Sequence, residues 1–212
     1  MGIREEQKRL TRENILKHTL ELLLVNGLVK VSTKDISAAS NVSQGSIFLH
    51  FSSKDNLISS IISENLSKLE ISLKQRVVSK SDRESFLRDL LNVLIDHENI
   101  LSRVYKDFAY VNEETKKNME HIDTMIRNLI FDNLRNTPGR KISIVDSFIS
   151  IDAFLAQIKQ NLRDKEIFTE FNSVIKQTRG KLVKLYKVLF GDFSWLNLKK
   201  LKRMTLKCCI NG

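Results

Sequence analysis

The chain has 212 residues, which is enough for one large or two small domains at about 100 to 200 residues per domain. Its net charge of +10 and its hydrophobic share of 42% exclude a disordered or fibrous protein. It contains 7 glycines and 1 proline, too few for an all-β sandwich or barrel with a turn about every 8 to 12 residues, so the composition predicts an all-α protein.

The first quarter of the chain is expected to form one long helix and two short ones. Apolar residues recur at helical spacing over residues 5–26, and Asn26-Gly27 is a stop signal. The Thr33 hydroxyl is positioned to cap a short second helix, and Ser40-Asn41-Val42 forms a tight turn. Ser43 is the expected cap of a third helix over residues 44–51.

Longer helices are expected after residue 53. An amphipathic run begins near Lys54 and continues toward Val78, and the next helix ends near Asn99. A shorter piece covers residues 100–111, and Asn112 is positioned to cap a further helix that ends at Pro138-Gly139. The last two helices are expected over residues 143–162 and 166–190.

Two short helices joined by a tight turn, preceded by a longer helix, are typical of a helix-turn-helix, whose later helix enters the DNA major groove. Several segments between residues 10 and 58 carry a family resemblance: Thr11-Arg12-Glu13-Asn14-Ile15-Leu16, Asn26-Gly27, Ser32-Thr33-Lys34-Asp35-Ile36, Val42-Ser43-Gln44-Gly45-Ser46-Ile47-Phe48-Leu49-His50-Phe51 and Ser53-Lys54-Asp55-Asn56-Leu57. With these segments the chain resembles the TetR family of bacterial transcriptional regulators. The resemblance implies a helix-turn-helix DNA-binding domain in residues 1–53 and a helical ligand-binding and dimerisation domain in residues 54–212.

The third helix carries the residues that we expect to read DNA bases. Gln44 and Ser46 offer hydrogen-bond donors and acceptors to base edges, and glutamine pairs well with adenine. Gly45 costs about 1 kcal/mol of helix propensity relative to alanine, and a close approach of DNA would compensate for this cost. Val42, Ile47 and Phe51 are expected to face the core. The complete expected DNA-binding set is Thr33, Lys34, Ser43, Gln44, Gly45, Ser46, Phe48, Leu49, His50 and Lys54.

The resemblance also implies phosphate contacts around the third helix, from Thr33, Ser43, His50 and Lys54. For the two hydroxyl residues, capping a helix and contacting a phosphate are compatible roles. Phe48 and Leu49 stand where the family commonly has tyrosines, so two phosphate hydrogen bonds are missing there. The N-terminal cations Arg4, Lys8, Arg9 and Arg12 could replace part of this affinity.

The second domain shows no motif, so the resemblance implies only its architecture. Adaptable apolar side chains are candidates to line an effector pocket, although each could equally be core: Tyr105, Phe108, Tyr110, Met119, Met125 and Phe131. The last two long helices would form the dimer interface or, alternatively, the core of one subunit. Their apolar residues are Ile144, Val145, Phe148, Ile151, Phe154, Leu155 and Ile158 on one helix and Phe168, Phe171, Ile175, Leu182, Leu185, Tyr186 and Leu189 on the other.

The sequence contains no pattern typical of an enzyme or a metal site. It has no glycine-rich phosphate loop, no Gly-x-Ser-x-Gly elbow and no i, i+4 histidine pair. The adjacent pair Cys208-Cys209 forms neither a disulfide framework nor a spaced metal site. For Asp96-His97-Glu98 and Glu120-His121 we expect ordinary surface roles. We therefore expect no catalysis, no metal and no cofactor.

Two further features bear on location and partners. No stretch approaches the ~18 apolar residues of a membrane span, and no apolar signal segment follows the charged N-terminus, so a cytoplasmic protein is expected. Residues 176–212 carry most of the net charge. That charge belongs either to a solvated face and tail or to a surface that attracts phosphates or membranes.

The sequence thus favours a repressor that binds a palindromic operator in double-stranded DNA as a homodimer and is released by a small apolar or aromatic effector. The alternative is an α-helical interaction protein whose basic C-terminus binds an acidic partner or a membrane surface. In that case Lys199, Lys200, Lys202 and Arg203 would carry the binding.

Overall fold

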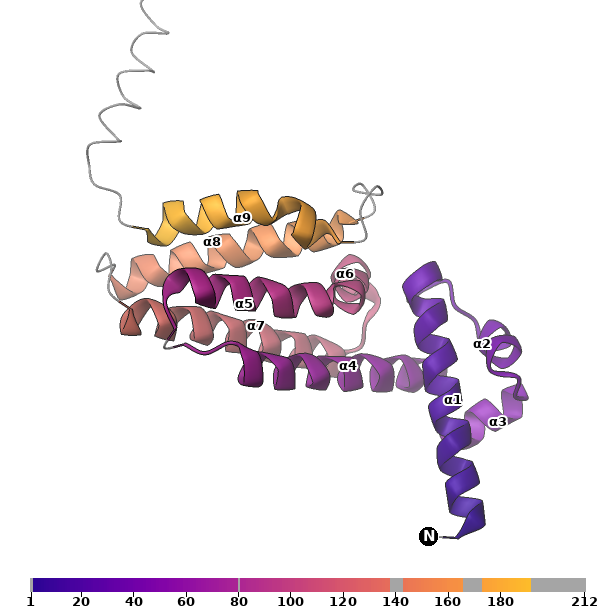
Figure 1. Ribbon diagram of the computed structural model, residues 1–212. Coiled ribbons are helices and arrows are strands. Elements are labelled where there is room, and N and C mark those ends of the chain that lie inside the picture. Colours follow the sequence, from indigo (N-terminus) through magenta and orange to yellow (C-terminus); the bar gives the residue numbers. More distant parts are fainter. Residues whose placement is uncertain (1, 80, 138–142, 166–172, 192–212) are drawn as a thin grey trace, which may run out of the picture.

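The computed structural model describes residues 2–79, 81–137, 143–165 and 173–191. Within these ranges the chain forms α-helices and one short 3-10 helix and no strand, which confirms the all-α prediction (Figure 1). The elements are α1 (Ile3–Asn26), α2 (Thr33–Ser40), α3 (Gln44–His50), α4 (Lys54–Arg76), α5 (Arg83–Asp96), α6 (Glu98–Lys106), η1 (Phe108–Tyr110), α7 (Glu113–Asn136), α8 (Ile144–Arg163) and α9 (Val174–Phe190).

Side-chain caps define where most of these helices begin. The caps expected from Ser43 and Asn112 are present, because their side chains accept hydrogen bonds from the backbone N–H groups of Ser46 and Thr115. The expected Thr33 cap is wrong. The Ser32 side chain accepts from the Asp35 N–H instead, and the Asp35 carboxylate accepts from the Ser32 N–H, so the reciprocal capping box starts α2 one residue earlier.

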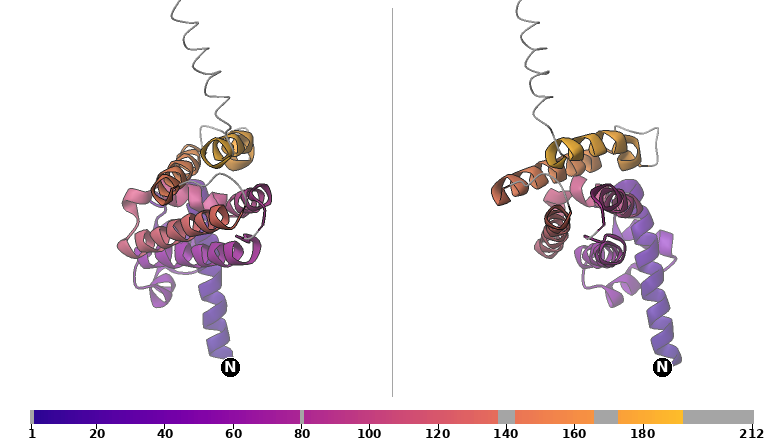
Figure 2. Two further views of the ribbon diagram at one scale, coloured as in Figure 1. Left: turned by 90° about the vertical axis from the view of Figure 1, so that its left-hand side faces the viewer. Right: turned by 60° about the vertical axis from the view of Figure 1, so that its left-hand side comes forward.

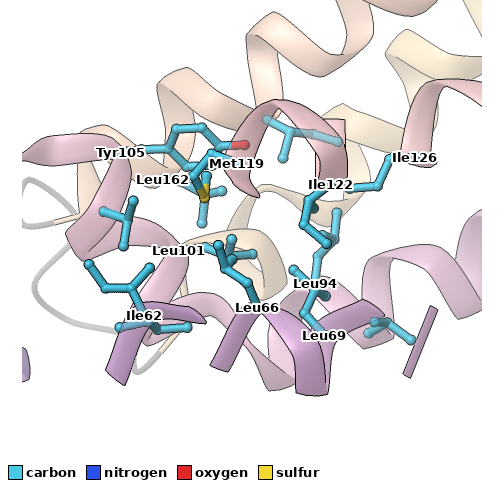
Figure 3. Packing of buried hydrophobic residues seen from close by; sticks show 14 of the residues in the cluster. Ile62, Leu66, Leu69, Leu94, Leu101, Tyr105, Met119, Ile122, Ile126 and Leu162 are labelled. Atoms are coloured by element: carbon cyan, nitrogen blue, oxygen red, sulfur yellow. The ribbon is translucent and has the colours of Figure 1, made fainter. Parts of the chain in front are cut away.

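Helices α4 to α8 enclose one apolar core. Figure 3 shows side chains from α4, α5, α6, α7 and α8 converging on its interior. Of the expected pocket residues, Tyr105 and Met119 are buried here, whereas Phe108, Met125 and Phe131 are partly buried against it. The Tyr105 hydroxyl donates to Asp123 Oδ1 at 2.7 Å, so its polar end is paired within the chain.

Helices α8 and α9 pack together and lie across α5, α6 and α7 (Figures 1 and 2). Much of the apolar surface that we considered for a dimer is core of the single chain: Ile151, Phe154, Leu155, Ile158, Ile175, Leu182 and Tyr186 are buried. Phe168 and Phe171 lie outside the described residues. In contrast, Ile144, Val145 and Phe148 at the start of α8 remain exposed.

The expected surface role of Glu98 is wrong, because this side chain is only 2% exposed. Its Oε1 accepts from the Val174 N–H at 2.8 Å, and its Oε2 accepts from the Ile175 N–H at 3.1 Å. The Ser173 hydroxyl also donates to Oε2, and Lys165 Nζ lies 3.1 Å from Oε1. A carboxylate from α6 therefore satisfies the free N–H groups of α9 and fixes that helix against the core.

No helix among the described residues combines the length and the apolar character needed to cross a membrane.

Replacing Glu98 by glutamine tests this buried cap. The Glu98→Gln side chain would turn an amide NH₂ toward backbone N–H donors and lose its charge pair with Lys165, so we expect the free energy of unfolding to fall by about 1–3 kcal/mol. Urea denaturation measures the change. Glu120→Gln, at an exposed position on α7, should change it by less than about 0.5 kcal/mol, and equal stabilities of the two variants would contradict the assignment.

Candidate DNA-binding surface

Helices α1, α2 and α3 form a small packed unit at one end of the molecule (Figure 1). Ile15, Ile36 and Ile47, one from each helix, are completely buried, and Phe51 is buried at the end of α3. Val42 is only partly buried against this core. Because apolar contacts hold all three helices, the outward side of α3 is presented on a rigid support.

The turn between α2 and α3 has the geometry expected of a helix-turn-helix. Asn41 adopts φ 51°, in the left-handed region that asparagine tolerates. The Ser37 hydroxyl donates to the Val42 carbonyl at 2.6 Å, and Asn14 of α1 donates from Nδ2 to the Ser40 carbonyl at 2.7 Å. These two bonds fix the end of α2 and therefore the direction in which α3 leaves the turn.

The exposed face of α3 gathers most of the residues expected to read DNA. Gln44 and Gly45 are exposed and Ser46 is partly buried. A Cβ at position 45 would meet only Ser43 Oγ at 3.8 Å, an ordinary contact, so packing within the chain does not require glycine there. Phe48 is 50% exposed and Leu49 81% exposed, which makes them available for apolar contact, for example with a thymine methyl group.

Hydroxyl groups lie around the start of α3. Ser43 Oγ accepts the Ser46 N–H at 3.0 Å, and its own hydrogen is left to donate to an outside acceptor such as a phosphate. The Thr33 hydroxyl donates to Gln44 Oε1 over 3.4 Å, a long bond that orients the amide of Gln44. Lys34 follows on α2 as an exposed cation.

A basic group lies where α1 passes the end of α3. The Arg12 guanidinium lies 4.8 Å from the centre of the Phe51 ring, next to His50. Burial lowers the pKa of His50, and the charges of Lys8 and Arg12 lower this pKa further. These two cations are therefore close to His50, and His50 is held as a neutral hydrogen-bonding group near neutral pH.

The other two N-terminal cations contribute less than the sequence suggested. Arg9 is committed to ion pairs with Glu6 at 2.6 Å and Glu13 at 2.5 Å, so its charge is neutralised within α1. Arg4 lies further along the exposed first turns of α1. Lys8 and Arg12 are thus the arm residues that the fold brings next to α3.

Lys54 lies at the junction of the two halves rather than on the α3 face. It is the first residue of α4, and its Nζ donates to the Val31 carbonyl at 3.1 Å. It also lines a cleft of about 350 Å³ between the loop after α1, the first turns of α4 and the η1 region. Of the six expected effector-pocket residues, Tyr110 lines this cleft and the other five do not.

Two residues that the sequence analysis did not single out attach α1 to the second half. Asp107 Oδ2 accepts the Leu28 N–H at 2.9 Å, and Arg103 Nη2 donates to the Leu24 carbonyl at 2.7 Å. Gly27 between them has φ +89°, and a Cβ there would lie 3.2 Å from Asp107 Oδ2. The Asn26-Gly27 stop signal predicted the chain reversal, but no local pattern links it to residues some 79 positions away.

Groups of three or more His, Cys, Asp or Glu side chains that could hold a metal ion are absent from the described residues. The chemistry that this surface offers is therefore hydrogen bonding, apolar contact and positive charge. These are the contacts by which helix-turn-helix proteins bind DNA.

Comparison with known proteins agrees with this geometry. Residues 15–61 match the family described as bacterial regulatory proteins, tetR family. The chain is 32% identical over 95 residues to the HTH-type transcriptional regulator YvdT of Bacillus subtilis, an alignment that covers 45% of this chain and 47% of the relative. The chain thus spans about half the length of the curated relative that it matches.

Solved structures share the fold over most of the chain. A TetR-family transcriptional regulator from Agrobacterium tumefaciens superposes with a TM-score of 0.66 at 15% identity, covering 84% of this chain and 98% of that one. A TetR transcription regulator from Haloarcula marismortui gives 0.66 at 16% identity, covering 84% and 97%.

The described fold is that of a helix-turn-helix unit joined to a helical second half. Its DNA-binding segment, residues 15–61, matches the tetR family of bacterial regulatory proteins, and the rest of the described chain shares the fold of solved TetR-family regulators.

Proposed function

We propose that the protein is a sequence-specific DNA-binding transcriptional repressor that binds a palindromic operator as a homodimer and is released by a small-molecule effector. The observation that carries the proposal is the exposed face of α3, with Gln44, Gly45 and two exposed apolar side chains on a rigid three-helix support. Catalysis has no part in it, and the chain would act in the cytoplasm, where it meets DNA.

Each group on this face has a defined task in the proposal. Gln44 reads a base edge by hydrogen bonding, with Ser46 beside it, and Phe48 and Leu49 contact apolar base or sugar surface. Thr33, Lys34 and Ser43 bind phosphates on one side of α3, and His50 binds one on the other with Lys8 and Arg12. Gly45 allows the backbone of α3 to approach the DNA closely.

The homodimer is supported by apolar side chains that the chain leaves uncovered. Ile144, Val145 and Ile149 on the first turns of α8 are each about two-thirds exposed, and Phe148 between them stacks on Phe131 with ring centres 5.0 Å apart. A neighbouring subunit would remove this surface from water, which stabilises association. Two subunits would place two α3 helices at a fixed separation.

Effector release requires a connection between the second half and α3. Helix α4 runs from the helix-turn-helix into the apolar core, and Arg103 and Asp107 fix the end of α1 to α6. An effector that prefers a different arrangement of α4 and α6 would change the separation of the two α3 helices. It can release DNA only to the extent of that preference. We retain residues 1–53 and 54–212 as the two domains of this mechanism.

The alternative function depends on the basic residues Lys199, Lys200, Lys202 and Arg203, which lie outside the described residues. No observation on the described part favours it over DNA binding, and selection of binding sites from random DNA separates the two functions.

The central test is selection of binding sites from random duplex DNA at physiological salt. We expect a palindrome whose half-sites lie about 34–36 Å apart, or a multiple of this spacing. Gln44→Ala should lose about 1–3 kcal/mol of discrimination at one position of each half-site, whereas Gln177→Ala, at an exposed position on α9, should keep the full preference. Salt-sensitive binding without a consensus, unchanged by Gln44→Ala, would support the alternative function.

Gly45→Ala distinguishes an effect on the stability of the fold from an effect on the close approach of α3 to DNA. Nothing in the chain crowds this position, so alanine should raise the free energy of unfolding by up to about 1 kcal/mol. The added Cβ should nevertheless weaken operator binding, as measured by fluorescence anisotropy with labelled duplex. Gly180→Ala in α9, where a Cβ would also meet nothing within 4 Å, should stabilise similarly and bind the operator normally while the dimer remains intact. Unchanged affinity in Gly45→Ala would argue against close approach.

Ile149→Asp tests the proposed dimer surface. A carboxylate in an apolar interface is costly to desolvate, so we expect this variant to sediment as a monomer at concentrations where the parent protein is a dimer. Ile71→Asp, on an exposed part of α4, is the matched control and should not change the sedimentation. A dimer that tolerates Ile149→Asp would place the interface elsewhere.

A further inference from the structure

A second cleft of about 350 Å³ lies between α5 and α9, away from the α3 face. It is lined by the first turns of α5 and the last turns of α9: Arg83, Glu84, Leu87, Arg88, Arg179, Val183, Tyr186, Lys187, Phe190 and Gly191. None of these residues has a part in the proposed DNA contacts. We name it the α5–α9 cleft.

The cleft has an apolar floor. Leu87 and Phe190 are buried, and Val183 packs partly against the same core. Tyr186 and Phe190 lie with ring centres 4.7 Å apart and Phe154 meets Tyr186 edge-on at 5.4 Å, so the floor is a firm surface. Such a surface accepts the apolar body of a ligand.

Positive charge surrounds this floor. Four cations line the cleft, Arg83, Arg88, Arg179 and Lys187, against the single carboxylate of Glu84. Such an excess of one charge in a concave, partly apolar site favours an anion. Arg88 is paired with neighbouring Asp89 at 3.2 Å, whereas Arg179 is bonded to a neutral group, Asn92 Oδ1, at 3.2 Å, and keeps its full charge.

Arg83 is held in place by two bonds to neutral groups. Its Nε donates to the Thr137 hydroxyl at 3.0 Å, and its Nη1 donates to the Phe190 carbonyl at the end of α9. Its Nη2 makes no hydrogen bond to any described residue. The guanidinium is therefore positioned, still charged, and has donors left for an acceptor from outside.

Tyr186 adds an unpaired hydroxyl group to the cleft. Its side chain is 3% exposed, and its hydroxyl oxygen is buried without a hydrogen-bond partner among the described residues. Buried hydroxyl groups almost always have partners, so such a group calls for an explanation. Burial raises the pKa of Tyr186 to about 12, with the Arg83 charge acting in the opposite direction. The hydroxyl therefore keeps its proton at neutral pH and lies close enough to Arg83 to feel its charge.

We infer that the α5–α9 cleft binds a small amphipathic organic anion, with its acidic headgroup at the Tyr186 hydroxyl and the guanidinium groups of Arg83 and Arg179, and its apolar body on Leu87 and Val183. A carboxylate accepts from a phenol and from the forked donors of arginine at once. The headgroup supplies the partner that the Tyr186 hydroxyl lacks. The apolar floor supplies affinity that a bare inorganic anion would not gain.

The cleft is connected to the regulatory parts of the molecule. Its α5 wall leads directly into α6, which carries Arg103 and ends at the cap residue Asp107. Its α9 wall packs on α8, which carries the exposed apolar residues. An anion bound there would be the effector of the proposed repressor. Only this regulatory consequence rests on the proposed function, because binding of the anion to the cleft can be measured without DNA.

Isothermal titration calorimetry of the full chain with octanoate tests the site. We expect octanoate to bind at one site per chain and to bind more tightly than either inorganic phosphate, which has charge without an apolar body, or octanol, which has the body without charge. Tyr186→Phe and Arg179→Gln should each weaken octanoate binding about tenfold or more, the loss of one charge-assisted hydrogen bond. Lys181→Gln, an exposed α9 cation that does not line the cleft, should bind octanoate like the parent chain.

Tyr186→Phe also distinguishes a binding group from a structural one. Because the hydroxyl has no partner to lose, the variant should unfold at an equal or higher urea concentration while it binds octanoate less well. Octanoate affinity that is unchanged in Tyr186→Phe and Arg179→Gln, or matched by octanol, would overturn the inference.

The regulatory consequence is tested separately by adding octanoate to the operator complex. If octanoate releases DNA from the parent chain but not from Tyr186→Phe, the effector role is supported. If octanoate binds but does not release DNA, the effector role is refuted and the anion site remains. If the protein binds no operator, the proposed function is refuted and the calorimetric result for the cleft still holds.

Discussion

The structure depends on one continuous helix, α4, whose buried residues join the helix-turn-helix to the second half within one apolar core. The buried face of α4 begins with Leu57 beside the helix-turn-helix and continues through Leu66, Leu69 and Leu73 in the second half. Because a packed interior resists even small changes in volume, neither end of α4 can shift without a response at the other. Because of this constraint, the helix-turn-helix and the second half are expected to move together.

Polar contacts then determine how the two halves are oriented. The Arg103 guanidinium and the Asp107 carboxylate supply hydrogen bonds that the end of α1 and the loop after it would otherwise lack. Glu98 at the start of α6 does the same for the start of α9. Helix α6 therefore holds one helix on each side. A small movement of α6 would reach the α3 face through α1 and the proposed dimer surface through α9 and α8.

The described surface separates two kinds of positive charge. Lys8, Arg12 and Lys34 surround exposed, hydrogen-bonding and apolar groups on α1 to α3, where a long polyanion has unobstructed access. Arg83 and Arg179 instead lie at a concave site with an apolar floor, which favours a small anion with an apolar body. The fold thus turns a general excess of basic residues into two sites with different preferences.

The sequence by itself determined the helical class, the position of the helix-turn-helix and the caps at Ser43 and Asn112, because helical periodicity, turn residues and capping are local properties. Competition between neighbouring groups decided that Ser32 and not Thr33 caps α2, through the reciprocal bonds of Asp35. Only the tertiary structure decided which apolar residues of α8 are core, that Glu98 is buried and that Tyr186 lacks a partner. These outcomes depend on which helices meet, and those contacts join residues far apart in the chain that no local pattern pairs.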